Sequence, residues 1–218
     1  MNHKKIVIFD LDGVLLDSEP IYIAMNMRFF KELGATGITL EDYDRFIGIS
    51  ATTMWATIKE KAGLSQTVEE LKSMERELKH KTLGEAALVP TDGIVPFLEH
   101  LQQAGHTLAI ASSSLQKNVQ LILGKLGLAK YFDLVVTGED VVKGKPEPDI
   151  FLKVARHYGC PPEDCVVIED SANGVKAAKA AGMACLAYFN PHSGKQDLSK
   201  ADFIFDRFDD KKLYERIG

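Results

Sequence analysis

Two aspartates stand two residues apart, directly after a short apolar run near the start of the chain. Asp10 and Asp12 follow the apolar residues 6–9, and Gly13 comes next. If the extended geometry of a strand continues this far, both side chains point the same way, and the glycine lets the backbone turn close to a ligand. Taken alone, such an Asp-x-Asp-Gly sequence is more often a turn or a helix cap than a site.

Further polar side chains follow other apolar runs of the chain. They are Ser112, Ser113 and Ser114, then Glu169 and Asp170, with Lys145 between a glycine and a proline. Because ligands of open α/β sheets bind beyond the carboxyl ends of the strands, we expect these groups to meet at one sheet edge. Clustered carboxylates raise one another's pKa, and a hard divalent cation relieves the repulsion, magnesium being the usual choice near phosphate. The lysine and the hydroxyls complement an anion, so the set predicts a magnesium-dependent phosphoryl-transfer site.

Each of these residues also has a structural interpretation. The three serines are typical of the N-cap region of a helix, here one beginning near Leu115. Lys145 alone is typical of a solvated turn, and Asp170 or Ser171 could cap the helix that runs through Val175. Four such coincidences at one sheet edge are less expected than a common site.

The elements that must position these residues are short buried strands alternating with helices. Apolar runs at residues 6–9, 108–111, 134–136, 165–168 and 184–187, with a weaker run at 203–205, are typical of parallel strands buried on both faces. Helical periods alternate with them from about Leu88 onward, which predicts an α/β fold with a doubly wound parallel sheet.

Nearly a hundred residues separate the first two predicted strands, far more than one crossover helix needs. Within this stretch, helical periods end at Gly34 and at Gly63, and a third begins at Val68. We therefore expect residues 1–16 and 88–218 to form the α/β core, and residues 17–87 to form a small inserted helical cap domain.

Four segments of the chain resemble the motifs of a known family. Residues 9–20, Phe-Asp-Leu-Asp-Gly-Val-Leu-Leu-Asp-Ser-Glu-Pro, resemble the first motif of the haloacid dehalogenase (HAD) superfamily, in its branch of β-phosphoglucomutase-like phosphatases. Residues 111–114 (Ala-Ser-Ser-Ser), 144–149 (Gly-Lys-Pro-Glu-Pro-Asp) and 168–171 (Ile-Glu-Asp-Ser) resemble its second, third and fourth motifs in the same order. The resemblance covers nearly the whole chain and implies a HAD-like Rossmannoid core with a helical cap.

The resemblance also implies a role for each candidate residue. Asp10 would be the nucleophile that forms an aspartyl-phosphate, and Asp12 the general acid and base. The metal, Mg²⁺, would be held by Asp10, the backbone carbonyl of Asp12 and Asp170, with Glu169 as a direct or water-mediated ligand. The phosphate-binding residues would be Ser112, Ser113 and Lys145, of which Lys145 is also catalytic. The cap would act as a lid that supplies substrate contacts, with Glu19, Tyr22, Ile49 and Trp55 as candidates, although such an isoleucine and tryptophan are more often core residues.

Two departures from the mutases of this branch favour a phosphatase that hydrolyses small phosphorylated metabolites, with sugar phosphates as the family expectation. Those mutases carry an arginine after a Gly-x-Ser segment of the cap and a histidine early in the first cap helix. Here the positions hold Ala51 and Tyr22. A β-phosphoglucomutase-type mutase stays open as the alternative, and a phospho-accepting receiver-like signalling module as a distant one. Asp12 argues against a dehalogenase, because displacement of a halogen from carbon needs no acid to protonate an oxygen leaving group.

Composition limits the kinds of binding partner and the cellular compartment that we expect for this protein. The formal net charge is -5 with no basic stripe, which predicts a small-molecule partner and neither nucleic acid nor membrane. The three cysteines form no Cys-x-x-Cys pair, so we expect reduced thiols. Because the apolar run near the start is too short for a signal peptide and no run approaches the length of a membrane span, we expect a cytoplasmic protein. We also expect a monomer.

Overall fold

The computed structural model describes residues 4–47 and 49–217, and the chain divides into two compact units. One unit comprises residues 1–17 and 88–218, and the other comprises residues 18–87. Gly48, the glycine of the Gly-x-Ser segment, lies outside the described residues.

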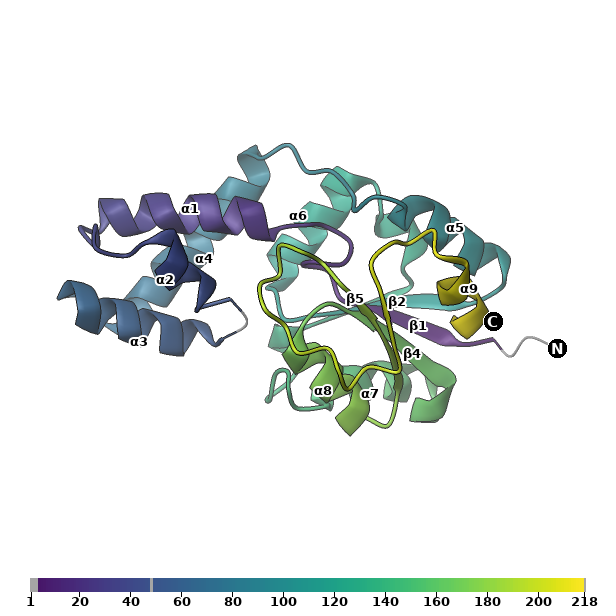
Figure 1. The fold of residues 1–218 in the computed structure, drawn as a ribbon. Coiled ribbons are helices and arrows are strands. Elements are labelled where there is room, and N and C mark those ends of the chain that lie inside the picture. Colours follow the sequence, from purple (N-terminus) through teal and green to yellow (C-terminus); the bar gives the residue numbers. More distant parts are fainter. Residues whose placement is uncertain (1–3, 48, 218) are drawn as a thin grey trace. The chain divides into compact units, whose positions relative to one another are not determined.

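A six-stranded sheet forms the centre of the first unit (Figure 1). Its strands are β1 (Ile6–Phe9), β2 (Thr107–Ser112), β3 (Leu134–Thr137), β4 (Cys165–Glu169), β5 (Ala184–Tyr188) and β6 (Phe203–Phe205). Their order is β3-β2-β1-β4-β5-β6, and every neighbouring pair is parallel. The predicted α/β fold class is confirmed, and each predicted strand agrees with the observed one to within a residue at either end.

Helices cover both faces of this sheet. The helices α5 (Ile94–Gln103) and α6 (Gln116–Leu126) lie in the crossovers from β1 to β2 and from β2 to β3. The helices α7 (Asp149–Tyr158) and α8 (Ala172–Ala180) lie in the crossovers that run the other way, from β3 to β4 and from β4 to β5 (Figure 1). Parallel crossovers are right-handed. Because the crossovers run in one direction along the sheet for the first helix pair and in the opposite direction for the second, the two pairs lie on opposite faces. The carboxyl end of β1 therefore lies at the switch point of the sheet, where ligands of such folds bind.

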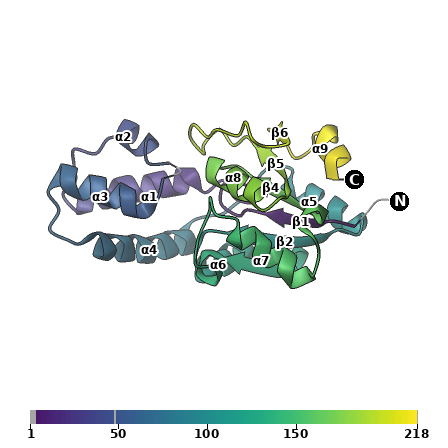
Figure 2. The same ribbon diagram turned by 90° about the horizontal axis from the view of Figure 1, so that it is seen from below.

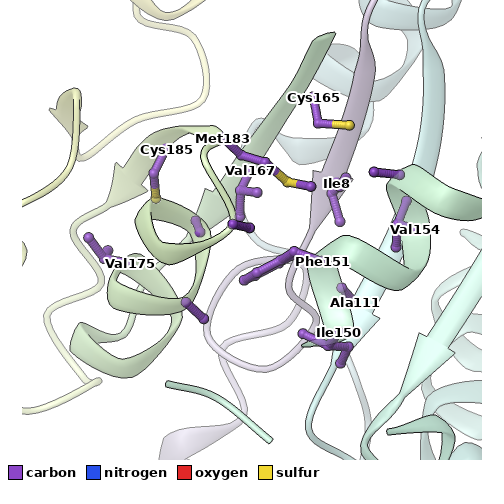
Figure 3. Packing of buried hydrophobic residues seen from close by; sticks show 14 of the residues in the cluster. Ile8, Ala111, Ile150, Phe151, Val154, Cys165, Val167, Val175, Met183 and Cys185 are labelled. Atoms are coloured by element: carbon purple, nitrogen blue, oxygen red, sulfur yellow. The ribbon is translucent and has the colours of Figure 1, made fainter. Parts of the chain in front are cut away.

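Successive side chains of β1 pack on opposite faces of the sheet. Ile8 packs with Phe151 and Val154 of α7 and with Val167 of β4 (Figure 3). Phe9 points the other way and meets Phe97 of α5, with ring centroids 6.1 Å apart. Burial of both faces explains why the strand is a continuous apolar run, and it fixes the position at which Asp10 leaves the sheet.

The described residues of the second unit form four helices (Figure 2). They are α1 (Glu19–Glu32), α2 (Leu40–Asp44), α3 (Ala51–Ala62) and α4 (Val68–Glu85). Trp55 is fully buried between Phe29 and Phe30, each with its ring centroid 5.6 Å from the indole, so Trp55 is a core residue.

Two α-helices in the described part of the chain have no counterpart in the sequence patterns. They are α2, with five residues, and α9 (Lys211–Ile217), with seven. Such short helices do not show a full apolar period; α2 instead begins with a reciprocal capping box between Thr39 and Asp42. Within the described residues, no helix has both the length and the hydropathy that crossing a membrane requires.

Candidate active site

The first motif changes direction immediately after β1. The strand ends at Phe9, and the Asp10 amide still donates to the carbonyl of Ile168 over 3.0 Å. The chain then turns, with Gly13 at a φ of 84° and Asp12 in an isolated bridge with Leu16. The extended geometry thus does not continue to Asp12, and the positions of the two aspartate side chains are set by their separate partners.

Lys145 joins the first and fourth motifs. Its Nζ lies 2.6 Å from Asp10 Oδ1 and 2.7 Å from Glu169 Oε1, and it also donates to the Ala111 carbonyl over 3.0 Å. These three acceptors match the three protons of an ammonium group. The side chain is 6% exposed, so Lys145 is not a solvated turn lysine.

Glu169 is tied down at both carboxylate oxygens. Oε1 accepts from Lys145, while Oε2 accepts from the backbone amides of Asp170 and Ser171 at 2.8 and 2.7 Å. A Cβ at Gly174 of α8 would collide with this carboxylate. The glycine therefore makes room for Glu169, which orients Lys145 and the loop that carries Asp170.

Asp170 is 6% exposed and accepts a hydrogen bond from the Ser193 hydroxyl at Oδ2. A Cβ at Gly13 would overlap the same carboxylate, so this turn needs glycine for space as well as for its positive φ. Ser171, and not Asp170, caps α8, since the Ser171 hydroxyl accepts from the Gly174 amide.

The serines of the second motif differ in their surroundings. Ser112 is buried and accepts from the Ser114 amide over 3.1 Å, whereas the Ser114 hydroxyl donates to Asp12 Oδ2 over 2.6 Å. Ser113 is exposed. The N-cap of α6 is Leu115, with no side-chain cap, so the interpretation of the serines as helix caps is wrong.

The buried acidic groups have strongly perturbed pKa values. Burial raises the pKa of Asp10 to about 7, with Glu169 adding to the rise and Lys145 opposing it. Burial and the neighbouring Glu169 and Asp10 also raise the pKa of Asp170 well above its usual range. Burial alone would lower the pKa of Lys145, but the carboxylates outweigh it and raise that pKa. The lysine therefore stays charged, and the site carries more carboxylates than it can neutralise.

Three of these carboxylates suit a hard divalent cation. Asp10, Glu169 and Asp170 each offer an oxygen, and these atoms lie within 4.8 Å of one another. All three residues are buried, and Lys145 supplies a single positive charge against them. An oxygen-only donor set with excess negative charge fits the metal that the motifs imply. The Asp12 side chain is not part of this group.

The sequence interpretation missed two residues on the loop after β5. They are Ser193, described above, and Asn190. The Asn190 Nδ2 donates to the Gly13 carbonyl over 3.0 Å and so supports the turn of the first motif. Both lie just beyond the carboxyl end of β5. Extending to this fifth strand the rule that found the other site residues would have included them.

Comparisons with known proteins agree with this geometry. A family model described as haloacid dehalogenase-like hydrolase matches residues 7–188. A phosphorylated carbohydrates phosphatase of Thermotoga maritima is 36% identical over 177 residues, covering 81% of each chain. A phosphoglycolate phosphatase of Salmonella typhi is 33% identical and covers 94% of this chain and 89% of its own.

Among solved structures, a proposed β-phosphoglucomutase of Thermotoga maritima superposes with a TM-score of 0.78. It is 30% identical and covers 98% of this chain and 100% of its own. The family match excludes the receiver-like module, and the phosphatase names of the curated relatives do not favour a mutase. The chain belongs to the haloacid dehalogenase-like hydrolases, as a phosphatase of the β-phosphoglucomutase-like branch.

Proposed function

We propose that the protein is a magnesium-dependent phosphatase that hydrolyses small phosphorylated carbohydrates through a phosphoryl group carried on Asp10. The observation that carries the proposal is the buried arrangement of Asp10, Lys145, Glu169 and Asp170 at the switch point of the sheet. Two of the three relatives described above, both phosphatases, point to phosphate monoesters.

In the first step, a carboxylate oxygen of Asp10 attacks phosphorus and the bond to the substrate oxygen breaks. Lys145 holds Oδ1, so we assign the attack to Oδ2. Asp12 donates its proton to the leaving oxygen, and the Ser114 hydroxyl fixes the orientation of the Asp12 carboxyl group. Ser112 and Lys145 bind phosphoryl oxygens, for which Lys145 exchanges one of its three present acceptors, with Ser113 as a further candidate.

In the second step, Asp12, now a carboxylate, removes a proton from water as the water attacks phosphorus. The bond to Asp10 breaks, inorganic phosphate leaves, and Asp12 ends protonated as it began. Asp10, Asp170 and the Asp12 backbone carbonyl would hold Mg²⁺, with Glu169 directly or through water. The ion would neutralise negative charge on the phosphoryl group. The helical unit would contribute substrate contacts.

The test is multiple-turnover hydrolysis of p-nitrophenyl phosphate by the full chain, with Mg²⁺ and with EDTA. We expect many phosphates released per protein molecule, only in the presence of the metal. Asp10→Asn should release none, because an amide does not accept the phosphoryl group. Equal rates in EDTA, or an active Asp10→Asn variant, would refute the mechanism.

The mutase alternative is tested with β-glucose 1-phosphate and a catalytic amount of glucose 1,6-bisphosphate. A phosphatase forms glucose and inorganic phosphate. Accumulation of glucose 6-phosphate without phosphate release would show a mutase and contradict the proposal.

A further inference from the structure

The β5 loop, residues 190–197, connects two motifs of the candidate site. Asn190 Nδ2 donates to the carbonyl of Gly13 in the first motif over 3.0 Å. The Ser193 hydroxyl donates to the carboxylate of Asp170 in the fourth motif. The β5 loop therefore contacts both the turn that follows the nucleophile and a candidate metal ligand.

The β5 loop lacks the hydrogen-bond ladder that would fix a strand. All of its residues are described, and they form neither helix nor strand. Two of its backbone hydrogen bonds, from Ser193 to Asn190 and from Gln196 to Gly194, stay within the loop. A segment of this kind opens locally at a low free-energy cost unless other contacts hold it. The position of the Ser193 hydroxyl thus depends on the side chains that attach the loop to its surroundings.

Gln196 attaches the β5 loop to the amino end of α8. Its Nε2 donates to the Ser193 carbonyl over 2.8 Å, and its Oε1 accepts from the Ala172 amide over 2.9 Å. Ala172 is the first residue of α8, where the backbone amides have no acceptor within the helix. Because a carbonyl accepts and a backbone amide donates, these two partners fix the orientation of the carboxamide.

Gln196 and Ser193 join the same two segments of the chain. Gln196 links the Ser193 backbone to Ala172, and the Ser193 side chain links the loop to Asp170, two residues before Ala172. Without the carboxamide, the Ser193 backbone loses one of its fixed points, and its hydroxyl is no longer held against Asp170. The affinity of a metal site depends on such partners, because they orient the ligands before the metal binds.

We propose that Gln196 is a positioning residue that acts through Ser193 to orient the Asp170 carboxylate toward the cation. The proposal rests on the proposed function, in which Asp170 holds Mg²⁺. The competing interpretation is that Gln196 only supports the amino end of α8. That role would change the free energy of unfolding and leave the Mg²⁺ affinity unaltered.

The test measures the Mg²⁺ affinity of the full chain without turnover. The metal is removed with EDTA, the chelator is dialysed away, and urea unfolding is followed at a series of Mg²⁺ concentrations. The free energy of unfolding without Mg²⁺ reports on stability, and its rise with Mg²⁺ gives the Kd. Both quantities therefore come from the same experiment.

Gln196→Met keeps most of the side-chain length but removes both hydrogen bonds. We expect the Kd for Mg²⁺ to rise about two- to tenfold, the equivalent of one hydrogen bond. Gln102→Met is the matched control. The Gln102 Nε2 lies 3.5 Å from the Tyr131 carbonyl, near the end of α5 that leads into the amino end of β2, so its loss should leave the Kd unchanged.

Gln196→Glu separates positioning from support of α8. The carboxylate can still accept from the Ala172 amide, and its charge suits the amino end of a helix, so stability should be retained. It has no proton to donate to the Ser193 carbonyl, so Mg²⁺ binding should weaken, although an added negative charge by itself favours a cation. This variant decides the outcome if Gln196→Met does not fold.

The route through Ser193 is tested by combining the substitutions. In the Ser193→Ala background the hydroxyl is absent, so Gln196→Met should change the Kd by less than about twofold. If Mg²⁺ stabilises the wild type but the Gln196 variants keep its Kd, or if Gln196→Met has the same effect with and without the hydroxyl, the Gln196 assignment alone fails. If Mg²⁺ does not stabilise the wild type, the metal site of the proposed function fails, and the Gln196 assignment fails with it.

Discussion

Replacing Lys145 by methionine tests whether this lysine offsets the free-energy cost of burying the acidic cluster. Methionine keeps most of the length of the side chain but removes the charge and all three hydrogen bonds. The side chains of Asp10 and Glu169 are 10% and 2% exposed, so water does not replace the ammonium group. Removing one partner of a buried ion pair costs about 3–5 kcal/mol.

For a protein of this size, each kcal/mol lowers the melting temperature by about 2–4 °C, so we expect Lys145→Met to melt about 6–20 °C lower. The assay is thermal unfolding in EDTA, because a bound cation would offset the loss. Lys153→Met is the control: its ammonium lies 3.3 Å from Asp140 Oδ1, with both side chains about 40% exposed. Such surface pairs contribute about 1 kcal/mol or less.

The same reasoning requires coupling between Lys145 and Glu169. In the Lys145→Met background, Glu169→Gln removes one unpaired carboxylate, so its effect should be less destabilising than in the wild type by about 0.5–3 kcal/mol. If Lys145→Met melts within about 2 °C of Lys153→Met, or if the effects of Lys145→Met and Glu169→Gln are additive, the stabilising role of the Lys145 ion pairs with Asp10 and Glu169 is refuted.

Four further predictions concern the metal, the site and the thiols. Because burial raises the folded-state pKa of Asp10 from 3.8 to about 7, the metal-free protein should lose stability as pH rises through that interval. Mg²⁺ at a fixed concentration, a hundredfold above its Kd at neutral pH, should restore about 2.7 kcal/mol there and less at about pH 5, where protonation of Asp10 weakens binding, and an equal effect at both would contradict the argument. Asp170→Ala should abolish activation by Mg²⁺ with little change in the melting temperature, whereas a pure folding defect would assign it a structural role. Ser193→Ala should raise the Mg²⁺ concentration for half-maximal activity about 10–100-fold, as expected for a residue that orients a ligand, and an unchanged requirement would exclude that role. The Sγ atoms of Cys160 and Cys165 lie 3.6 Å apart, so hydrogen peroxide should take one hydrogen from each thiol, forming one disulfide and two waters; mass spectrometry that finds both thiols intact would refute it.

The strands of the sheet, and most of the residues that lie together at the candidate site, could be predicted from the sequence. Each buried strand is a run of apolar residues because both of its faces are covered, and this is visible without any knowledge of its neighbours. The residues after β1, β2 and β4 could be collected because parallel strands end at a common edge. The family motifs added a fixed order of functional residues along the chain, which hydrophobic periodicity does not reveal.

Which of these groups touch depends on the tertiary structure. Lys145 donates a hydrogen bond to Asp10, 135 positions away in the chain, and Asn190 donates one to Gly13, 177 positions away. The structure also showed that Gly174 is glycine because the Glu169 carboxylate occupies the space of a Cβ, and that Gln196 joins the β5 loop to α8. Periodicity reports only whether a side chain faces the core. Hydrogen bonds depend on atomic positions set jointly by strand register and helix packing, which couple residues that are distant in sequence.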